Sequence, residues 1–282
     1  MARWRTATTL VSVTAVLAGV IHLASCSAFS ATTDAADAAS GADAAGPTDG
    51  ADSGAPPDAG APFDAAGCST SLALDFEDPA FPPASFTILK STTGGKVTRS
   101  GDLGTNKSGA LLSELTVPQS GGAFAHILRT FDLPPGPSEL RVAYDFTAPT
   151  ANPIYASVGC ELLLRPTSAD TPSTDVYFTV TNGDGPQLNI SDNPSKGDHQ
   201  RSAVLEPPGS GFHHAELTVV LGASGTPSTV HGFLGTSPVD LSFTLVPDPT
   251  NVVLRCGFYA DTTLGAASIV VDNVSFAICP KP

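Results

Sequence analysis

The feature that most constrains the fold of this chain is the alternation of apolar and polar side chains in several short runs. From residue 139 to residue 146, Leu, Val, Tyr and Phe fall on one face and mostly polar residues on the other. The same alternation occurs at 174–180, 216–219 and 240–245. Because successive side chains of a strand point to opposite faces, this period of two predicts half-buried strands.

Turn-forming residues separate these runs. Pro and Gly gather at 134–137, at 182–185 and at 207–209. The patterns give about a dozen candidate strands and no convincing amphipathic helix, which is typical of a sandwich or a barrel. We therefore predict that 68–282 forms one all-β domain, a single antiparallel β-sandwich of the jelly-roll type. A chain of this length buries a sizeable core without a second domain.

The N-terminus has the layout of an export signal. Arg3 and Arg5 form a short basic region, and 6–24 contains no Asp, Glu, Lys or Arg and is rich in Leu, Val and Ala. This segment ends in Leu-Ala-Ser-Cys at 23–26, which resembles the bacterial lipobox, whose Cys is acylated after cleavage. Residues 1–25 are thus predicted to be a lipoprotein signal peptide. The alternative is an ordinary signal peptide with an incidental Cys.

Lipidation of Cys26 would anchor the mature chain in a lipid bilayer. It also explains the cysteine count, because four cysteines remain beyond Cys26, an even set that suits an oxidising compartment. Ser27 stands where Asp would retain some bacterial lipoproteins at the inner membrane. We therefore expect an exported, membrane-anchored lipoprotein at the outer membrane or cell surface.

A spacer follows the anchor. From 27 to 67 the chain is almost wholly Ala, Asp, Gly, Ser, Thr and Pro, with seven Asp and no Lys, Arg or Glu. Only Phe29 and Phe63 could be buried, so folding would not offset the loss of chain entropy. The segment 26–67 is predicted to be a lipidated Cys followed by a disordered linker that holds the domain away from the membrane.

Three segments resemble landmarks of the concanavalin A-like lectin/laminin-G jelly-roll superfamily and related carbohydrate-binding modules. They are Leu-Asp-Phe-Glu-Asp at 74–78, Gly-Phe-His-His-Ala-Glu-Leu-Thr-Val at 211–219 and Ile-Val-Val-Asp-Asn-Val-Ser-Phe at 269–276. They occur in the expected order and span nearly the whole domain. The resemblance implies the jelly-roll fold, which hosts enzymes, lectins and structural modules alike.

The expected fold favours one arrangement of disulfides. Four cysteines permit three pairings. In a jelly roll the first and last strands usually pair, which would bring Cys68 near Cys279, and Cys160 and Cys256 lie in two apolar strands. We predict the bonds 68–279 and 160–256; the alternative is that some of the four are free buried thiols.

The same resemblance implies a tentative calcium site. In many related modules, acidic residues of the first strand and the Asp of the closing strand share a structural ion, and the matching residues here are Glu77, Asp78 and Asp272. The alternative is that Asp272 satisfies a turn or backbone amides while Glu77 and Asp78 are solvated. Adjacent residues in a strand would also point Glu77 and Asp78 to opposite faces.

Aromatic residues give the only guess at a ligand-binding surface. The one Trp is Trp4 in the signal peptide, so the mature domain lacks the commonest platform for sugar stacking, although Tyr and Phe also stack. Tyr155, Tyr259 and Phe81 are the candidate ligand-binding residues. A binding domain is expected to cluster such aromatics on one sheet or on the loops at one end.

Motifs for catalysis are absent from the sequence. There is no Glu-x-Asp-x-x-Glu pattern of the kind laminarinases carry on this fold, and no Gly-x-Ser-x-Gly or Cys-x-x-Cys motif. His213 and His214 would face opposite sides of a strand and share no metal. His126, His199 and His231 are isolated in sequence. We predict no catalytic residues.

Net charge narrows the partners further. The formal net charge of −14 argues against binding to nucleic acid. The sequence therefore favours a non-catalytic cell-surface lipoprotein whose domain serves in binding or adhesion, with a glycan or another surface protein as candidate partner. The alternative is a structural envelope component with no small ligand, and a glycan-active enzyme comes third.

Overall fold

The computed structural model describes residues 67–281, except 117–118, 151–154, 167–172, 182–184, 192–199, 205–210, 224, 236, 245–247 and 264. The predicted signal peptide at 1–25, the lipidated Cys26 and the linker as far as residue 66 lie outside the described residues. No helix in the described part of the chain is long and apolar enough to cross a membrane.

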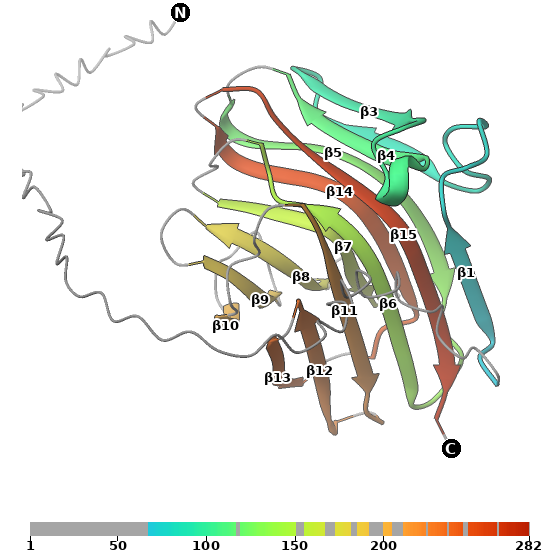
Figure 1. The fold of residues 1–282 in the computed structure, drawn as a ribbon. Coiled ribbons are helices and arrows are strands. Elements are labelled where there is room, and N and C mark those ends of the chain that lie inside the picture. Colours follow the sequence, from blue (N-terminus) through green and yellow to red (C-terminus); the bar gives the residue numbers. More distant parts are fainter. Residues whose placement is uncertain are drawn as a thin grey trace, which may run out of the picture. The chain divides into compact units, whose positions relative to one another are not determined.

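The described domain is built from two antiparallel sheets (Figure 1). Its other regular element is a short 3-10 turn at Thr105–Lys107. Sheet A contains β1 (Thr70–Leu74), β3 (Gly95–Ser100), β4 (Ala110–Leu115), β6 (Ser138–Thr147), β11 (Phe212–Leu221), β12 (Pro227–Leu234), β13 (Ser237–Thr244) and β15 (Ala267–Pro280). Sheet B contains β2 (Thr87–Lys90), β5 (Gln119–Asp132), β7 (Tyr155–Arg165), β8 (Thr174–Thr181), β9 (Gly185–Ser191), β10 (Gln200–Val204) and β14 (Asn251–Thr263).

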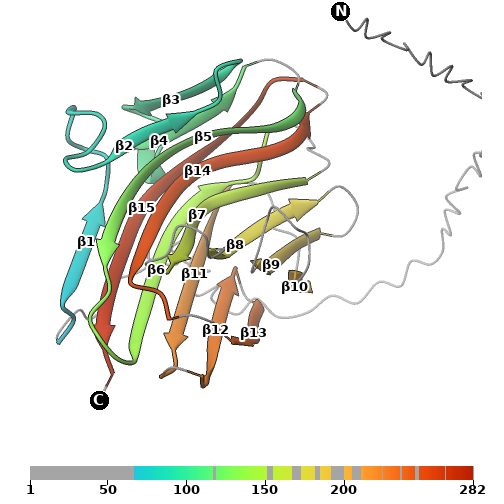
Figure 2. The same cartoon turned by 180° about the vertical axis from the view of Figure 1, so that it is seen from behind.

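The long C-terminal strands lie near the middle of the two sheets. Sheet A has the order β13-β12-β11-β6-β15-β4-β3, with β1 also paired to β15, and sheet B has the order β10-β9-β8-β7-β14-β5-β2. Seen from behind, β5, β14 and β15 bend along their length (Figure 2). The predicted all-β sandwich is confirmed.

Alternation along the strands builds one core between the sheets. In β6, Leu140, Val142, Tyr144 and Phe146 are all fully buried, as their spacing predicts. Removing a side chain of this size from water stabilises a fold by about 1.5–3 kcal/mol. The core is continuous across both sheets, so the inner faces of the two sheets hold the sandwich together.

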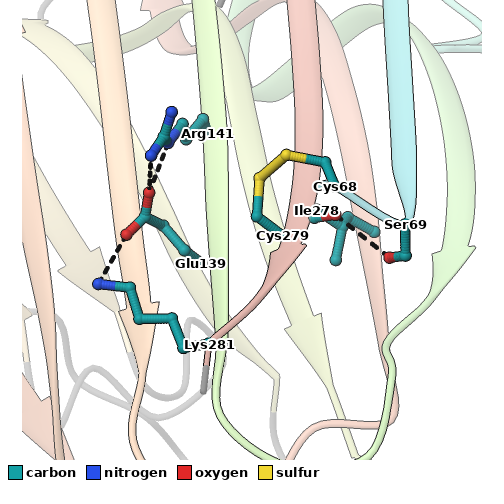
Figure 3. The surroundings of a disulfide bond; sticks show 7 residues. All are labelled: Cys68, Ser69, Glu139, Arg141, Ile278, Cys279 and Lys281. Carbon is teal, nitrogen blue, oxygen red and sulfur yellow. Dashed lines mark hydrogen bonds and ion pairs between the residues drawn. A yellow bond between two sulfur atoms is a disulfide. The ribbon is translucent and has the colours of Figure 1, made fainter. Parts of the chain in front are cut away.

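The first and last strands pair as expected. Thr70 of β1 lies opposite Ile278 of β15, and the predicted disulfide joins Cys68 to Cys279 with sulfur atoms 2.05 Å apart. Figure 3 shows this bond and, nearby, Glu139 bound by two basic side chains of the same region. The bond fixes the start of the domain to its last strand.

The second predicted disulfide joins neighbouring strands of sheet B. Cys160 of β7 lies directly opposite Cys256 of β14, and their sulfur atoms are 2.09 Å apart. Both residues are buried in the core between the sheets. In the chain-entropy model, closing loops of such length stabilises the fold by at most roughly 4–5 kcal/mol each.

One local expectation is wrong. Residues 74–78 do not continue a strand, because β1 ends at Leu74 and Phe76 has a positive φ of 56°. Asp75 and Asp78 instead accept hydrogen bonds from the backbone N–H groups of Glu77 and Ala80. Such short-range side-chain acceptors stabilise turns in competition with a strand. Glu77 and Asp78 therefore do not alternate across a strand.

Gly159 of β7 shows how closely the sheets approach. Its φ is +79°, and a Cβ there would lie 2.0 Å from Cε2 of Tyr144 in the opposite sheet. Gly225 has a similar φ of +76°, but no heavy atom lies within 4 Å of the position that a Cβ would take there. Substitutions at the two glycines therefore distinguish two costs: backbone strain, which both positions share, and a clash with a neighbouring side chain, which only Gly159 has.

We expect Gly159→Ala to lower the free energy of unfolding by about 3 kcal/mol or more, since overpacking adds to the backbone strain. Gly225→Ala, the control, carries the backbone strain alone and should lose about 1 kcal/mol. Urea unfolding measures both. Equal losses would show that Tyr144 moves aside without resistance.

Candidate functional site

Asp272, one of the predicted calcium ligands, is fully buried at an irregularity in β15. The pairing of β15 with β6 shifts between Asp272 and Ser275, and Asn273 between them has a φ of 48°. The Oδ2 atom of Asp272 accepts hydrogen bonds from the Thr105 N–H (2.8 Å) and the Ser108 hydroxyl (3.1 Å). Burial raises the pKa of Asp272, and these hydrogen bonds oppose that rise.

Glu77 holds the other end of the same loop. Its Oε1 atom accepts a hydrogen bond of 2.7 Å from the Gly109 N–H. A Cβ at Gly104 would lie 2.7 Å from Oδ2 of Asp272, so the loop approaches that carboxylate closely. Two carboxylates distant in sequence thus hold 104–109, Asp272 from β15 and Glu77 from the turn after β1.

The three predicted calcium ligands do not form a common site. Asp78 is exposed and caps the Ala80 N–H, whereas Asp272 is buried and bonded to N–H and O–H donors. Among the described residues, no three His, Cys, Asp or Glu side chains are arranged to hold a metal ion. The three carboxylates therefore do not form a calcium site as predicted. Calcium binding stays a prediction, and a thermal shift assay with calcium and with a chelator would test it.

We expect Asp272→Asn to lower the free energy of unfolding by about 2 kcal/mol or more, because an amide group would face donors that the carboxylate now satisfies. Asp78→Asn keeps an acceptor in an exposed turn and should change it by less than about 0.5 kcal/mol. Denaturant titration gives both values. A loss for Asp272→Asn that vanished in the presence of a chelator would point to an ion instead of the loop.

A second polar network links β6, β11 and β15 on the outer face of sheet A. Nδ1 of His214 lies 2.8 Å from Oδ1 of Asp145, and its Nε2 lies 3.0 Å from Oε1 of Glu216. Asn273 donates to Asp145 Oδ2 at 2.7 Å, which ties the network to the irregularity in β15. His213 faces the other way, with its ring edge-on to Phe146, so the two adjacent histidines lie on opposite faces as predicted.

This network makes stability depend on pH. Hydrogen bonding to Asp145 raises the pKa of His214, burial opposes the rise, and the hydrogen bond to Glu216 adds to it. A raised pKa in the folded state means that the stabilisation is fully present below the unfolded value and is lost as the pH rises through the folded value.

We therefore expect His214→Gln to lower the free energy of unfolding more at about pH 5 than at about pH 9. The measurement is denaturant unfolding of wild type and variant at both values. His231→Gln is the control, because His231 pairs with exposed Asp240 at 2.8 Å on the same sheet and such surface pairs contribute little. The opposite pH trend would contradict the assignment of charge to His214.

Aromatic residues gather on the outer face of sheet B. Phe124 of β5 lies directly opposite Tyr259 of β14, and both side chains are only partly buried. Their core-facing neighbours Ala125 and Phe258 are fully buried, so the two rings point away from the core. The Tyr259 hydroxyl lies 2.8 Å from where a Cβ of Gly122 would stand, so the ring lies over that glycine and an alanine there would require the end of the ring to shift.

Charged side chains lie further along the same face, four residues from Tyr259 in β14. Nε of Arg255 lies 2.5 Å from Oε1 of Glu161, as an ion pair whose N–H is not aligned for a hydrogen bond. Nη2 of Arg255 lies 4.0 Å from Oδ2 of Asp175. Burial raises the pKa values of Glu161 and Asp175, and the attraction of Arg255 opposes both rises. Arg255 is thus held between two carboxylates.

His126 joins this cluster as a neutral group. Its Nε2 lies 3.7 Å from Oε1 of Glu161, and its ring stacks on Phe124 with centroids 6.1 Å apart. Burial, with a smaller contribution from Arg255, lowers the pKa of His126 to about 3. Its Nδ1 has no hydrogen-bond partner among the described residues. A buried polar atom without a protein partner is unusual in a folded protein.

The sequence located only part of this face. Tyr259 lies on it, whereas Phe81 packs against the core, and the side chain of Tyr155 lies outside the described residues. His126, which is isolated in sequence, lies in this cluster in space; His231 pairs with Asp240, and His199 lies outside the described residues. Phe124, Glu161 and Arg255 were missed, because only strand pairing brings them together.

Comparison with known proteins identifies the fold. No protein-family model matches the chain, and no curated protein matches it. Among solved structures, an endo-β-1,4-glucuronan lyase from the fungus Trichoderma reesei matches with a TM-score of 0.54 and 12% identity, over 74% of this chain and 95% of that one. The lectin UEA-II in complex with galactose matches with a TM-score of 0.50 and 11% identity, over 76% of this chain and 100% of that one.

These neighbours are concanavalin A-like jelly rolls, and the described domain has that fold. The resemblance seen in three short segments of sequence is thereby confirmed at the level of fold. At such low identity, the likeness carries neither ligand nor activity from one protein to the other, because one architecture serves both lectins and enzymes.

Proposed function

We propose that this chain is a non-catalytic cell-surface lipoprotein whose jelly-roll domain binds glycans on the outer face of sheet B. The observation that carries the proposal is the pair of partly exposed rings, Phe124 and Tyr259, next to the buried polar cluster around His126. Fold neighbours include a lectin with bound galactose, which is consistent with this use of the fold.

The chemistry of the face suits a saccharide. The C–H face of a sugar ring packs against an aromatic ring, while its hydroxyls need nearby hydrogen-bonding groups. Ser157 of β7 lies opposite Tyr259 and His126 lies on the adjoining row, but both are buried, so a ligand on the rings meets the Tyr259 hydroxyl before either of them. The face thus combines apolar area with neutral polar groups.

Binding is favoured over catalysis by the burial of the titratable groups. The side chains of His126 and Glu161 are only 4% and 8% exposed, so neither reaches a ligand lying on the rings as a general base must. A glycan-active enzyme is the second candidate, because one fold neighbour is a polysaccharide lyase. Product formation by the purified chain on polysaccharides would favour it.

The anchor and the location rest on the N-terminal sequence. A lipid on Cys26 and the acidic linker would present the domain at the outer membrane or cell surface, with a glycan or another surface protein as partner. The competing proposal is a structural envelope component with no small ligand. The rings on sheet B favour a binder, because a purely structural unit has no need of exposed aromatics.

We expect Tyr259→Ala and Phe124→Ala each to weaken glycan binding about tenfold or more, because each removes half of the stacking surface. Phe233→Ala is the matched control: Phe233 is also partly exposed but lies on β12 of sheet A. A glycan array finds the ligand, and calorimetry compares the variants. Equal losses for all three variants would remove sheet B as the binding face.

A further inference from the structure

The charges on the outer face of sheet B indicate which class of glycan this face would bind. Alternation along the strands places Asp132, Glu161, Asp175, Arg165 and Arg255 on this face, so its described part carries three carboxylates and two guanidinium groups. His126 adds no charge near neutral pH, because burial holds its pKa at about 3. The described face therefore has no excess of positive charge.

Arg255 lies four residues from Tyr259 along β14, on the same face of sheet B, and it is already engaged. It lies between Glu161 at 2.5 Å and Asp175 at 4.0 Å, and its side chain is 23% exposed. A carboxylate from a ligand would be the third anion around this one guanidinium, after Glu161 and Asp175. One positive charge would then be shared among three anions, so the gain from binding a ligand carboxylate there is small.

We infer that the ligand of this face is an uncharged saccharide and that the face discriminates against uronic acids. The inference rests on the proposed glycan binding and names its ligand class. A neutral sugar brings no charge to the rings of Phe124 and Tyr259, whereas a uronate brings a negative charge toward Glu161 and Asp175. The like-charge contact and the prior engagement of the nearby arginine both act against a uronate.

The test uses pairs of ligands that differ only at C6 of the sugar. Neutral oligosaccharides of glucose, galactose and mannose are compared with their C6-oxidised counterparts of equal length and linkage, on the purified full-length chain by calorimetry. We expect the neutral member of at least one pair to bind about tenfold or more tightly than its oxidised counterpart. Preference for the oxidised member would overturn the inference and leave glycan binding standing. No binding to any of these or to a wider array would overturn the proposed function itself.

A variant tests the role of the engaged arginine. Glu161→Gln removes one of the two anions that hold Arg255, so discrimination against the oxidised ligand should fall by about tenfold. Asp132→Asn is the control, because it makes the same change of charge at the exposed end of β5. Circular dichroism shows whether each variant is folded. A folded Glu161→Gln variant with unchanged discrimination would overturn the role assigned to Arg255. If the variant fails to fold, the comparison of neutral and oxidised ligands on the wild-type chain tests the inference.

Discussion

The hydrogen-bonded ladders of β15 are the interaction on which the rest of the domain depends. This last strand pairs with β6 along one edge and with β4 and then β1 along the other, so it joins segments from both ends of the domain. The Cys68–Cys279 disulfide locks the outer end of this arrangement. Because the strands that pair with β15 are distant in sequence, their pairing costs chain entropy. Burial of the core between the two sheets offsets that cost.

The same strand positions polar groups as well as apolar ones. At the irregularity next to Asp272, β15 brings one buried carboxylate to the loop at 104–109 and one amide, that of Asn273, to Asp145. A bulge re-aims side chains without ending the strand, which is how a core strand comes to carry a polar network. Two of the acidic residues that the sequence singled out thus hold one loop from two sides: Asp272 ties it to the last strand, and Glu77 ties it to the turn after β1.

The fold was largely predictable, whereas the candidate site was not. The alternation of apolar and polar residues predicted the buried face of β6, and the expected jelly roll predicted both disulfides. These predictions were possible because burial and strand order are reflected in short-range sequence patterns. The candidate binding face was found only through Tyr259. Phe124, Glu161 and Arg255 come from three strands and show no common motif, so their proximity depends on register alone.

The sequence by itself predicted an all-β sandwich and an even set of cysteines beyond Cys26, because period-two patterning and cysteine parity are local or countable properties; the pairing of those cysteines followed from the expected jelly roll. It also carries the only support for the lipid anchor at Cys26. The tertiary structure decided which polar groups meet: it placed His126 against Glu161, and Asp272 beneath a loop. The physical reason is that a pKa, an ion pair or a binding face arises from distances across strands, and those distances exist only once the sheets are paired and packed.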